Sequence, residues 1–194
     1  MTSTDSASYT AVAKILHWLI AATIIFMIIL GYCFDYIPRG ETRFYFIQLH
    51  KSIGISILLL SFVRLAWRLT HHAPPLPASM PVWEQRAAHI GHVFLYVMMI
   101  GVPLSGWAMV SASPMHIPTI LFGLMPWPAM PGAGQLNNFI NLDDLHAVAA
   151  YTLGALAVGH AAAALKHHFV SRDDVLLRMM PACFASCLSR ARQK

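Results

Sequence analysis

The chain has 194 residues, of which 57% are hydrophobic and only 11% charged, and its mean hydropathy is +0.58. This composition is too apolar for an average soluble domain and predicts an integral membrane protein. The formal net charge of +5 does not indicate nucleic-acid binding, because the basic residues lie at the ends of apolar segments and in a short tail, not on one basic face.

Apolar segments long enough to cross a bilayer, which takes about 20 helical residues, dominate the chain. They cover residues 11–36, 44–69, 83–111 and 142–169. We expect an all-α fold, an integral membrane four-helix bundle with two haems in its core for the reasons given below. Residues 1–181 would form this one domain, and residues 182–194 a short basic cytoplasmic tail.

Proline and glycine mark the connections between these segments. The longest one, "ASPMHIPTILFGLMPWPAMPGAGQLNN", combines proline and glycine with many apolar residues. It is too hydrophobic to extend freely into water, so we expect it at the membrane interface with Trp127 as an anchor.

The distribution of lysine and arginine predicts the orientation of the chain. Basic residues on one side are Lys14, Arg64, Arg68, Arg86, Lys166, Arg172, Arg178, Arg190, Arg192 and Lys194, and on the other side Arg39, Arg43 and Lys51. The positive-inside rule therefore places both termini in the cytoplasm.

Two histidines lie on one face of the fourth segment. His146 and His160 are fourteen residues apart, close to four helical turns, so they are separated by roughly 21 Å along the axis. His17 follows the basic start of the first segment, at the depth of His160. His50 follows the polar turn before the second segment, at the depth of His146. The sequence thus predicts two histidine pairs at two depths.

Each pair offers two nitrogen donors, which suits haem. An iron porphyrin supplies four nitrogens itself and needs two axial ligands, whereas zinc takes about four protein ligands and a di-iron centre takes several carboxylates. The middle of the apolar segments holds no acidic residue, which disfavours di-iron chemistry and carboxylate-based proton pumping. We expect His17, His50, His146 and His160 to ligate iron in two haems.

Several residues near these histidines have more than one interpretation. Gly54 and the small residues of the fourth segment either leave room for flat macrocycles or serve ordinary close helix packing. Arg64, fourteen residues after His50, either pairs with a propionate of the inner haem or extends to the membrane surface. Lys51 either pairs with a propionate of the outer haem, attracts anions, or only sets topology.

Further candidates lie on the third segment. His89 and His92 are spaced i, i+3, so they could contact neighbouring side chains, line a quinone pocket, or replace His17 as a ligand. Ser105 and Trp107 are candidate walls of a pocket, although aromatic residues at an interface are usually anchors.

Five motifs together resemble the bacterial cytochrome b-561 family, the di-haem quinone-linked cytochromes that include the superoxide oxidases. They are "ILHWLIA", "QLHKSIGISILLLSFVRLAWRL", "AHIGHVFLYVMMIGVPLSGW", "DDLHAVAAYTLGALAVGHAAAALKHHF" and "DDVLLRMMP". The similarity covers nearly all of residues 9–181.

The resemblance implies a multi-pass protein of the bacterial inner membrane with two haem b groups (iron protoporphyrin IX), bound by His17, His50, His146 and His160. It also implies electron exchange with ubiquinone and, for the superoxide-oxidase branch, oxidation of periplasmic superoxide to dioxygen. We therefore expect a superoxide:ubiquinone oxidoreductase, with membrane lipid, quinone and superoxide as partners and no nucleic acid. The resemblance assigns no catalytic residue.

Two alternatives belong to other functional classes. The chain would instead be a cytochrome b subunit that relays electrons between a partner dehydrogenase or hydrogenase and the quinone pool. Histidine-based metal transport is poorly supported, because no membrane carboxylate is present to help bind and release a cation.

Overall fold

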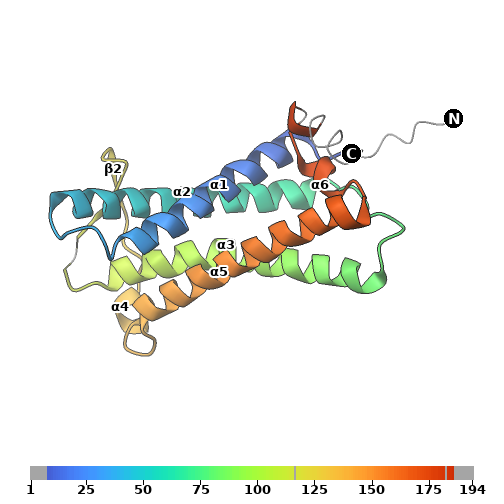
Figure 1. The fold of residues 1–194 in the computed structure, drawn as a ribbon. Helices are drawn as coiled ribbons and strands as arrows, with labels where there is room; N and C mark the ends of the chain where they lie inside the picture. The colour runs from blue at the N-terminus through green and yellow to red at the C-terminus, as the bar shows by residue number, and fades with distance from the viewer. Residues whose placement is uncertain (1–7, 116, 182, 186–194) are drawn as a thin grey trace.

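The computed structural model describes residues 8–115, 117–181 and 183–185. Within these residues, four helices are long and apolar enough to cross a membrane. They are α1 (Ala11–Cys33), α2 (Glu41–Thr70), α3 (Val82–Ala112) and α5 (Leu142–Lys166), the last continued by the π-helical turn η1 (His167–Ser171). They run side by side as an elongated bundle (Figure 1), which confirms the expected all-α membrane four-helix bundle.

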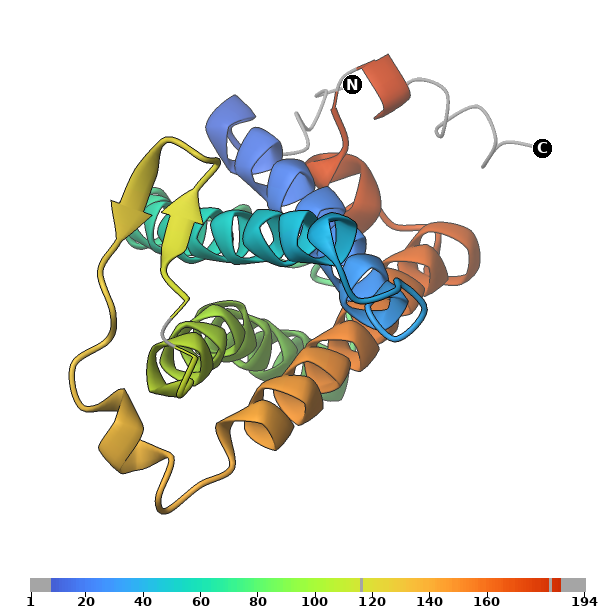
Figure 2. The same cartoon turned by 90° about the vertical axis from the view of Figure 1, so that its left-hand side faces the viewer.

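The bundle has two distinct ends. The end that carries the α1–α2 turn and the connection between α3 and α5 is called the loop end (Figure 1). The other, called the terminal end, carries the start of α1, the α2–α3 connection, η1 and the short helix α6 (Val175–Met179). Seen along the bundle in Figure 2, α1, α2, α3 and α5 follow one another around it, and α5 also contacts α1.

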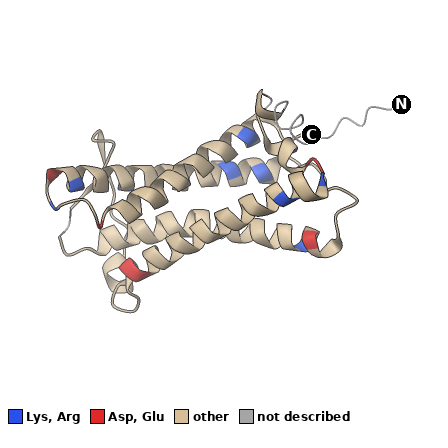
Figure 3. Ribbon diagram, in the orientation of Figure 1, with Lys and Arg blue, Asp and Glu red and all other residues tan. Residues whose placement is uncertain are grey.

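Local sequence explains where the helices begin. The Thr10 hydroxyl accepts a hydrogen bond from the Ala13 N–H at 3.2 Å and caps α1. The Asn141 side chain accepts from the N–H groups of Asp143 and Asp144 and caps α5. These two carboxylates also favour the N-terminus of α5, where the helix dipole is positive. Charged residues otherwise gather near the helix ends, with lysine and arginine mainly at the terminal end (Figure 3).

The core of the bundle is a compact apolar cluster at mid-height. It consists of Ile20, Ile24, Ile57, Met99 and Leu153, contributed by all four long helices. Many other large apolar side chains point outward, for example Ile25 and Phe26 on α1 and Val158 on α5. An outward apolar surface of this kind suits contact with lipid tails.

A proline in α3 is compensated by a serine of α2. Pro103 has no N–H, so the carbonyl of Met99, four residues earlier, loses its helical donor. The fully buried Ser61 hydroxyl lies 3.5 Å from this carbonyl and donates to it. The carbonyl left without its donor in α3 thus takes part in a hydrogen bond between two helices.

The segment between α3 and α5 contains structure that the sequence did not predict. Strands β1 (Thr119–Leu121) and β2 (Met125–Trp127) form an antiparallel hairpin, with Phe122 and Gly123 at positive φ in the turn. The short helix α4 (Ala133–Leu136) follows. The expected interfacial anchor Trp127 packs its ring against Trp107, with ring centroids 5.8 Å apart.

The hairpin is attached to α2 by the buried Ser52. The Ser52 hydroxyl accepts a hydrogen bond from the Phe122 N–H at 2.9 Å and donates one to the Gln48 carbonyl at 2.8 Å. The Gln48 amide also donates to the Pro118 carbonyl at 3.0 Å. The long connection is therefore held against the turns of α2 that flank His50.

The helix bounds differ only slightly from the expected ones. The end of α1, the start of α2 and the end of α5 each differ by three residues from the expected bounds, and in α5 the expected helix to residue 169 changes into η1 after Lys166. The expected tail of residues 182–194 lies outside the described residues except for 183–185.

Candidate functional site

The structure brings the four predicted histidines together in two pairs. At the loop end, His50 of α2 faces His146 of α5, with ring centroids 6.3 Å apart and ring planes at 80°. Toward the terminal end, His17 of α1 faces His160 of α5, with centroids 6.1 Å apart and planes at 65°. These are the two juxtapositions expected from depth; the role of the four side chains as haem ligands stays a prediction.

The ring separations fit an axial pair on one metal ion. A metal–imidazole bond is roughly 2.0–2.1 Å long and a ring nitrogen lies ~1.1 Å from its ring centre, so two rings in line across one ion have centres about 6.3 Å apart. The measured values of 6.1 and 6.3 Å agree with this spacing. Two protein donors per site suit haem, which brings four nitrogens of its own.

His146 is oriented by contacts to α3. Its Nδ1 atom lies 3.1 Å from the Val102 carbonyl oxygen and 3.1 Å from the Ser105 hydroxyl. Since a carbonyl only accepts, Nδ1 carries the proton, and this assignment leaves the Nε2 lone pair for a metal. Such a second hydrogen bond is the usual way in which proteins orient a metal-binding histidine. Ser105, expected only as a pocket wall, thus contacts a predicted ligand directly.

Gly106 allows α3 to approach His146 closely. A Cβ atom at position 106 would lie 2.9 Å from Cε1 of His146, closer than real Cβ contacts. By contrast, a Cβ at Gly54, the glycine that the sequence offered beside His50, would meet Met27 at an ordinary 3.8 Å. Gly106 is therefore a glycine whose lack of a side chain the contact with His146 requires, and only the folded structure identifies it.

His50 has an unused buried nitrogen. Its Nδ1 atom is buried and has no hydrogen-bond partner among the described residues. Its ring lies edge-on to Phe34, with centroids 5.4 Å apart, and its Cε1 would be 3.8 Å from a Cβ at Gly31. A buried imidazole with an unpaired nitrogen is costly in an apolar protein unless a ligand uses the ring.

Arg64 contacts His17 at the terminal-end pair. Its Nη2 atom lies 3.2 Å from His17 Nδ1, and its Nη1 donates to the Ala13 carbonyl at 3.2 Å. The structure places this half-buried guanidinium at the inner depth, as the spacing from His50 predicted. In the residues described, no carboxylate forms an ion pair with it.

His92 adds a third imidazole to the terminal-end site. Its ring centroid is 5.3 Å from that of His160, shorter than the 6.1 Å between His17 and His160. Both His17 and His92 therefore lie beside His160, and which of them is the ligand stays a prediction. His89, its neighbour in the i, i+3 motif, is exposed.

Lys51 points to the long connection. Its Nζ atom donates to the Ile117 carbonyl at 3.5 Å, next to the contacts made by Gln48 and Ser52. The loop end also carries the acidic Glu41, Asp143 and Asp144 at its helix starts, so its charge is mixed.

Comparisons with known proteins bear on these sites. A family model described as prokaryotic cytochrome b561 matches residues 8–182. Cytochrome b561 homolog 2 of Escherichia coli (strain K12) is 33% identical over 175 residues, which are 89% of this chain and 90% of that protein. The probable superoxide oxidase CybB of Yersinia pestis is 32% identical over 169 residues, 86% of this chain and 92% of that protein. Cytochrome b562 of Cereibacter sphaeroides is 28% identical over 186 residues, 91% and 98% of the two chains.

Proposed function

Because this chain belongs to the prokaryotic cytochrome b561 family, whose members transfer electrons in bacterial membranes by means of haem b, we propose that it is a superoxide:ubiquinone oxidoreductase. The observation that carries the proposal is the pairing of imidazoles at two depths, with ring centroids 6.3 and 6.1 Å apart. The similarity to a probable superoxide oxidase supports the choice of electron donor.

In this proposal each histidine pair holds one haem b. His50 and His146 hold the haem at the loop end, and His17 and His160 hold the haem toward the terminal end. Bound haem b supplies reversible one-electron iron chemistry. The protein residues hold and orient the group: Val102 and Ser105 fix the His146 ring, and the Arg64 guanidinium would turn from His17 to a propionate.

The orientation follows from the basic residues. Lysine and arginine gather at the terminal end (Figure 3), which by the positive-inside rule supports a cytoplasmic terminal end and a periplasmic loop end. Superoxide would then reach the loop-end site from the periplasm. Lys51 beside His50 would attract this anion, in competition with the acidic residues of the same end.

The electron balance explains the use of two sites. Two superoxide anions each give up one electron and become two dioxygen molecules. One ubiquinone takes up these two electrons and two protons and becomes ubiquinol. A protein that stores electrons at two sites can therefore connect a one-electron donor to a two-electron acceptor.

A second candidate function is supported by the names of the other relatives. Cytochrome b561 homolog 2 and cytochrome b562 are named as cytochromes and not as oxidases. The chain would then relay electrons between a partner dehydrogenase or hydrogenase and quinone, and it would co-purify with that partner and lack a small-molecule donor of its own.

The test is the haem content and redox spectrum of the purified full-length protein. We expect two haem b per chain in the native protein, one in His146→Ala and one in His160→Ala. His89→Ala is the matched control and keeps both, and so does His92→Ala if His17 is the ligand. Superoxide alone should reduce the haems, and added ubiquinone should reoxidise them.

Each other result has a definite meaning. A native protein without haem would overturn the whole proposal. Two haems that superoxide leaves oxidised would reject the oxidase and favour the partner-dependent subunit. Loss of a haem in His92→Ala but not in His17→Ala would exchange the roles of these two residues.

A further inference from the structure

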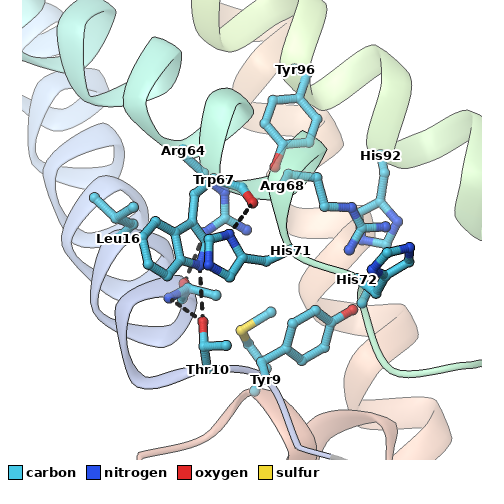
Figure 4. Close-up of a pocket in the computed structure, with 13 residues that line it drawn as sticks. Tyr9, Thr10, Leu16, Arg64, Trp67, Arg68, His71, His72, His92 and Tyr96 are labelled. Carbon is cyan, nitrogen blue, oxygen red and sulfur yellow. Dashed lines mark hydrogen bonds between the residues drawn. The ribbon is translucent and has the colours of Figure 1, made fainter.

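A basic pocket opens at the terminal end of the bundle. It lies between the end of α2, α3, the start of α1 and α6, and Figure 4 shows its lining. Two arginines, three histidines and two tyrosines contribute polar groups to it: Arg64, Arg68, His71, His72, His92, Tyr9 and Tyr96. The described residues that line it include no aspartate or glutamate. The pocket therefore presents hydrogen-bond donors and positive charge to whatever enters it.

Arg68 is the cation in this pocket whose charge is not compensated. Arg64, one turn earlier on α2, donates to Ala13 and His17. Arg68 is exposed and makes no hydrogen bond or ion pair within the part of the chain that the structure describes. It lies close enough to His92 for the two to interact electrostatically. Because Arg64 is assigned to a haem propionate above, Arg68 is the guanidinium of this pocket that remains to attract an anion.

The histidines of the pocket differ in how firmly they are held. His71 stacks on Trp67, with centroids 3.7 Å apart and planes at 9°, and its Nδ1 faces the Trp67 carbonyl at 3.2 Å. His72 is exposed and has no hydrogen bond within the described ranges. An imidazole N–H is available as a donor in either protonation state, so His72 can turn toward a ligand beside Arg68.

The surroundings of the pocket place it at the surface of the membrane. It lies at the end of α2, where the apolar span stops, and Leu69, next to Arg68, is 78% exposed on the outside of the bundle. Trp18 donates its indole N–H to the Met179 carbonyl at 3.0 Å, and Trp67 donates to Thr10 at 3.0 Å. Indole rings at this height are typical of the zone where lipid headgroups lie.

We propose that this pocket binds the phosphate of an anionic phospholipid headgroup, with Arg68 and His72 as its main donors and Leu69 against an acyl chain. A guanidinium presents a fork of N–H groups that matches phosphate oxygens. Basic pockets between membrane helices on the cytoplasmic side are suited to anionic headgroups. The proposal is independent of the electron donor and acceptor proposed above.

The test compares phosphatidylglycerol with phosphatidylcholine on the full-length haem-loaded protein. The protein is placed in mixed micelles that contain both lipids in equal amounts, and retained lipids are counted by native mass spectrometry. The native protein should retain phosphatidylglycerol in preference. Arg68→Gln should weaken this retention by about tenfold, as expected for one lost charge-assisted contact. Arg86→Gln, an exposed arginine on α3 outside the pocket, is the matched control and should retain the lipid.

Equal retention of both lipids, or unchanged retention in Arg68→Gln, would overturn the proposal. Inorganic phosphate is the second probe, and its effect on the midpoint of thermal unfolding is compared with that of phosphatidylglycerol. If both raise the midpoint equally and the protein does not prefer phosphatidylglycerol to phosphatidylcholine, the site takes free phosphate and the lipid assignment is wrong. The haem spectrum checks that each variant is folded. If Arg68→Gln does not fold, the exposed His72→Asn takes its place, and the same loss of preference is required.

Discussion

The Nη2 atom of Arg64 lies 3.2 Å from Nδ1 of His17, so a guanidinium donates to the imidazole that faces His160. An arginine cannot accept a hydrogen bond, and Nδ1 of His17 is therefore the acceptor. In a neutral ring the proton then lies on Nε2, the nitrogen that would bind iron. His146 shows the opposite arrangement, because its Nδ1 donates to Val102. The loop-end site is thus oriented for a metal, whereas the terminal-end site requires Arg64 to change partner.

Substitution of Arg64 should change the reduction potential of one haem and leave the other unchanged. A partly buried cation near a propionate stabilises the reduced haem by about 1–2 kcal/mol. Arg64→Gln should therefore lower the reduction potential of the terminal-end haem by tens of millivolts. Arg64→Lys keeps the positive charge and should lower this potential much less. Potentiometric titration measures both haems, with Arg86→Gln as control. Equal potentials in Arg64→Gln and the native protein would show that Arg64 does not contact the haem.

A methyl group at position 106 should disturb the loop-end site selectively. The Cβ of Gly106→Ala would meet His146 Cε1 at 2.9 Å, so the ring must move off its contacts with Val102 and Ser105. We expect loss or weak binding of one haem in Gly106→Ala. Gly101→Ala on the same helix is the matched control, because nothing lies within 4 Å of its Cβ. The number of haems per chain is the measurement. Two firmly bound haems in Gly106→Ala would contradict the close approach of α3 to His146.

Ser61 and Pro103 should be coupled in stability. Ser61→Ala leaves the buried Met99 carbonyl without its donor and should cost about 1 kcal/mol. In the double variant Ser61→Ala/Pro103→Ala, the new N–H at position 103 can donate to Met99, so the serine change should cost less than it does beside proline. Thermal unfolding of the four proteins of this double-mutant cycle gives the coupling. Strictly additive effects would show that the two residues do not share Met99.

The attachment of the hairpin to α2 can be tested by proteolysis. Ser52→Ala removes the acceptor for the Phe122 N–H, and chymotrypsin should then cut the exposed turn around Leu124 several times faster. Ser56→Ala is the control, because among the described residues the Ser56 hydroxyl donates its hydrogen bond to the Ser52 carbonyl of its own helix and not to the hairpin. A cleavage rate in Ser52→Ala equal to that in Ser56→Ala would mean that other contacts hold the hairpin.

Substitution of Lys51 can test whether this residue attracts superoxide, as proposed. Lys51→Gln removes one positive charge beside the loop-end site and should lower the rate of haem reduction by superoxide a few-fold at low salt, with a weaker dependence on salt. Stopped-flow measurements at several ionic strengths follow this, and the proteolysis assay shows whether the connection stays attached. An unchanged rate and salt dependence would remove Lys51 from the proposal.

The sequence predicts the helices well because length and hydropathy alone determine which segments span a membrane. It also predicts the partners His17–His160 and His50–His146, since residues at equal depth in a bundle of parallel axes meet. It does not predict that Gly106 contacts His146 or that Ser61 compensates Pro103, because these contacts depend on the rotation of each helix about its axis. The hairpin is missed for another reason: its strands are only three residues long, too short to show an alternating pattern.

Both histidine pairs share α5, which contributes His146 and His160, while the opposite histidines come from two different helices. One continuous helix therefore determines the spacing between the two sites. A shift of α1 or α2 relative to α5 would change how closely the two rings of a pair approach, but it would leave the separation along α5 at fourteen residues. In the proposed di-haem protein, an electron that passes between the two sites would therefore cross a distance that α5 alone determines.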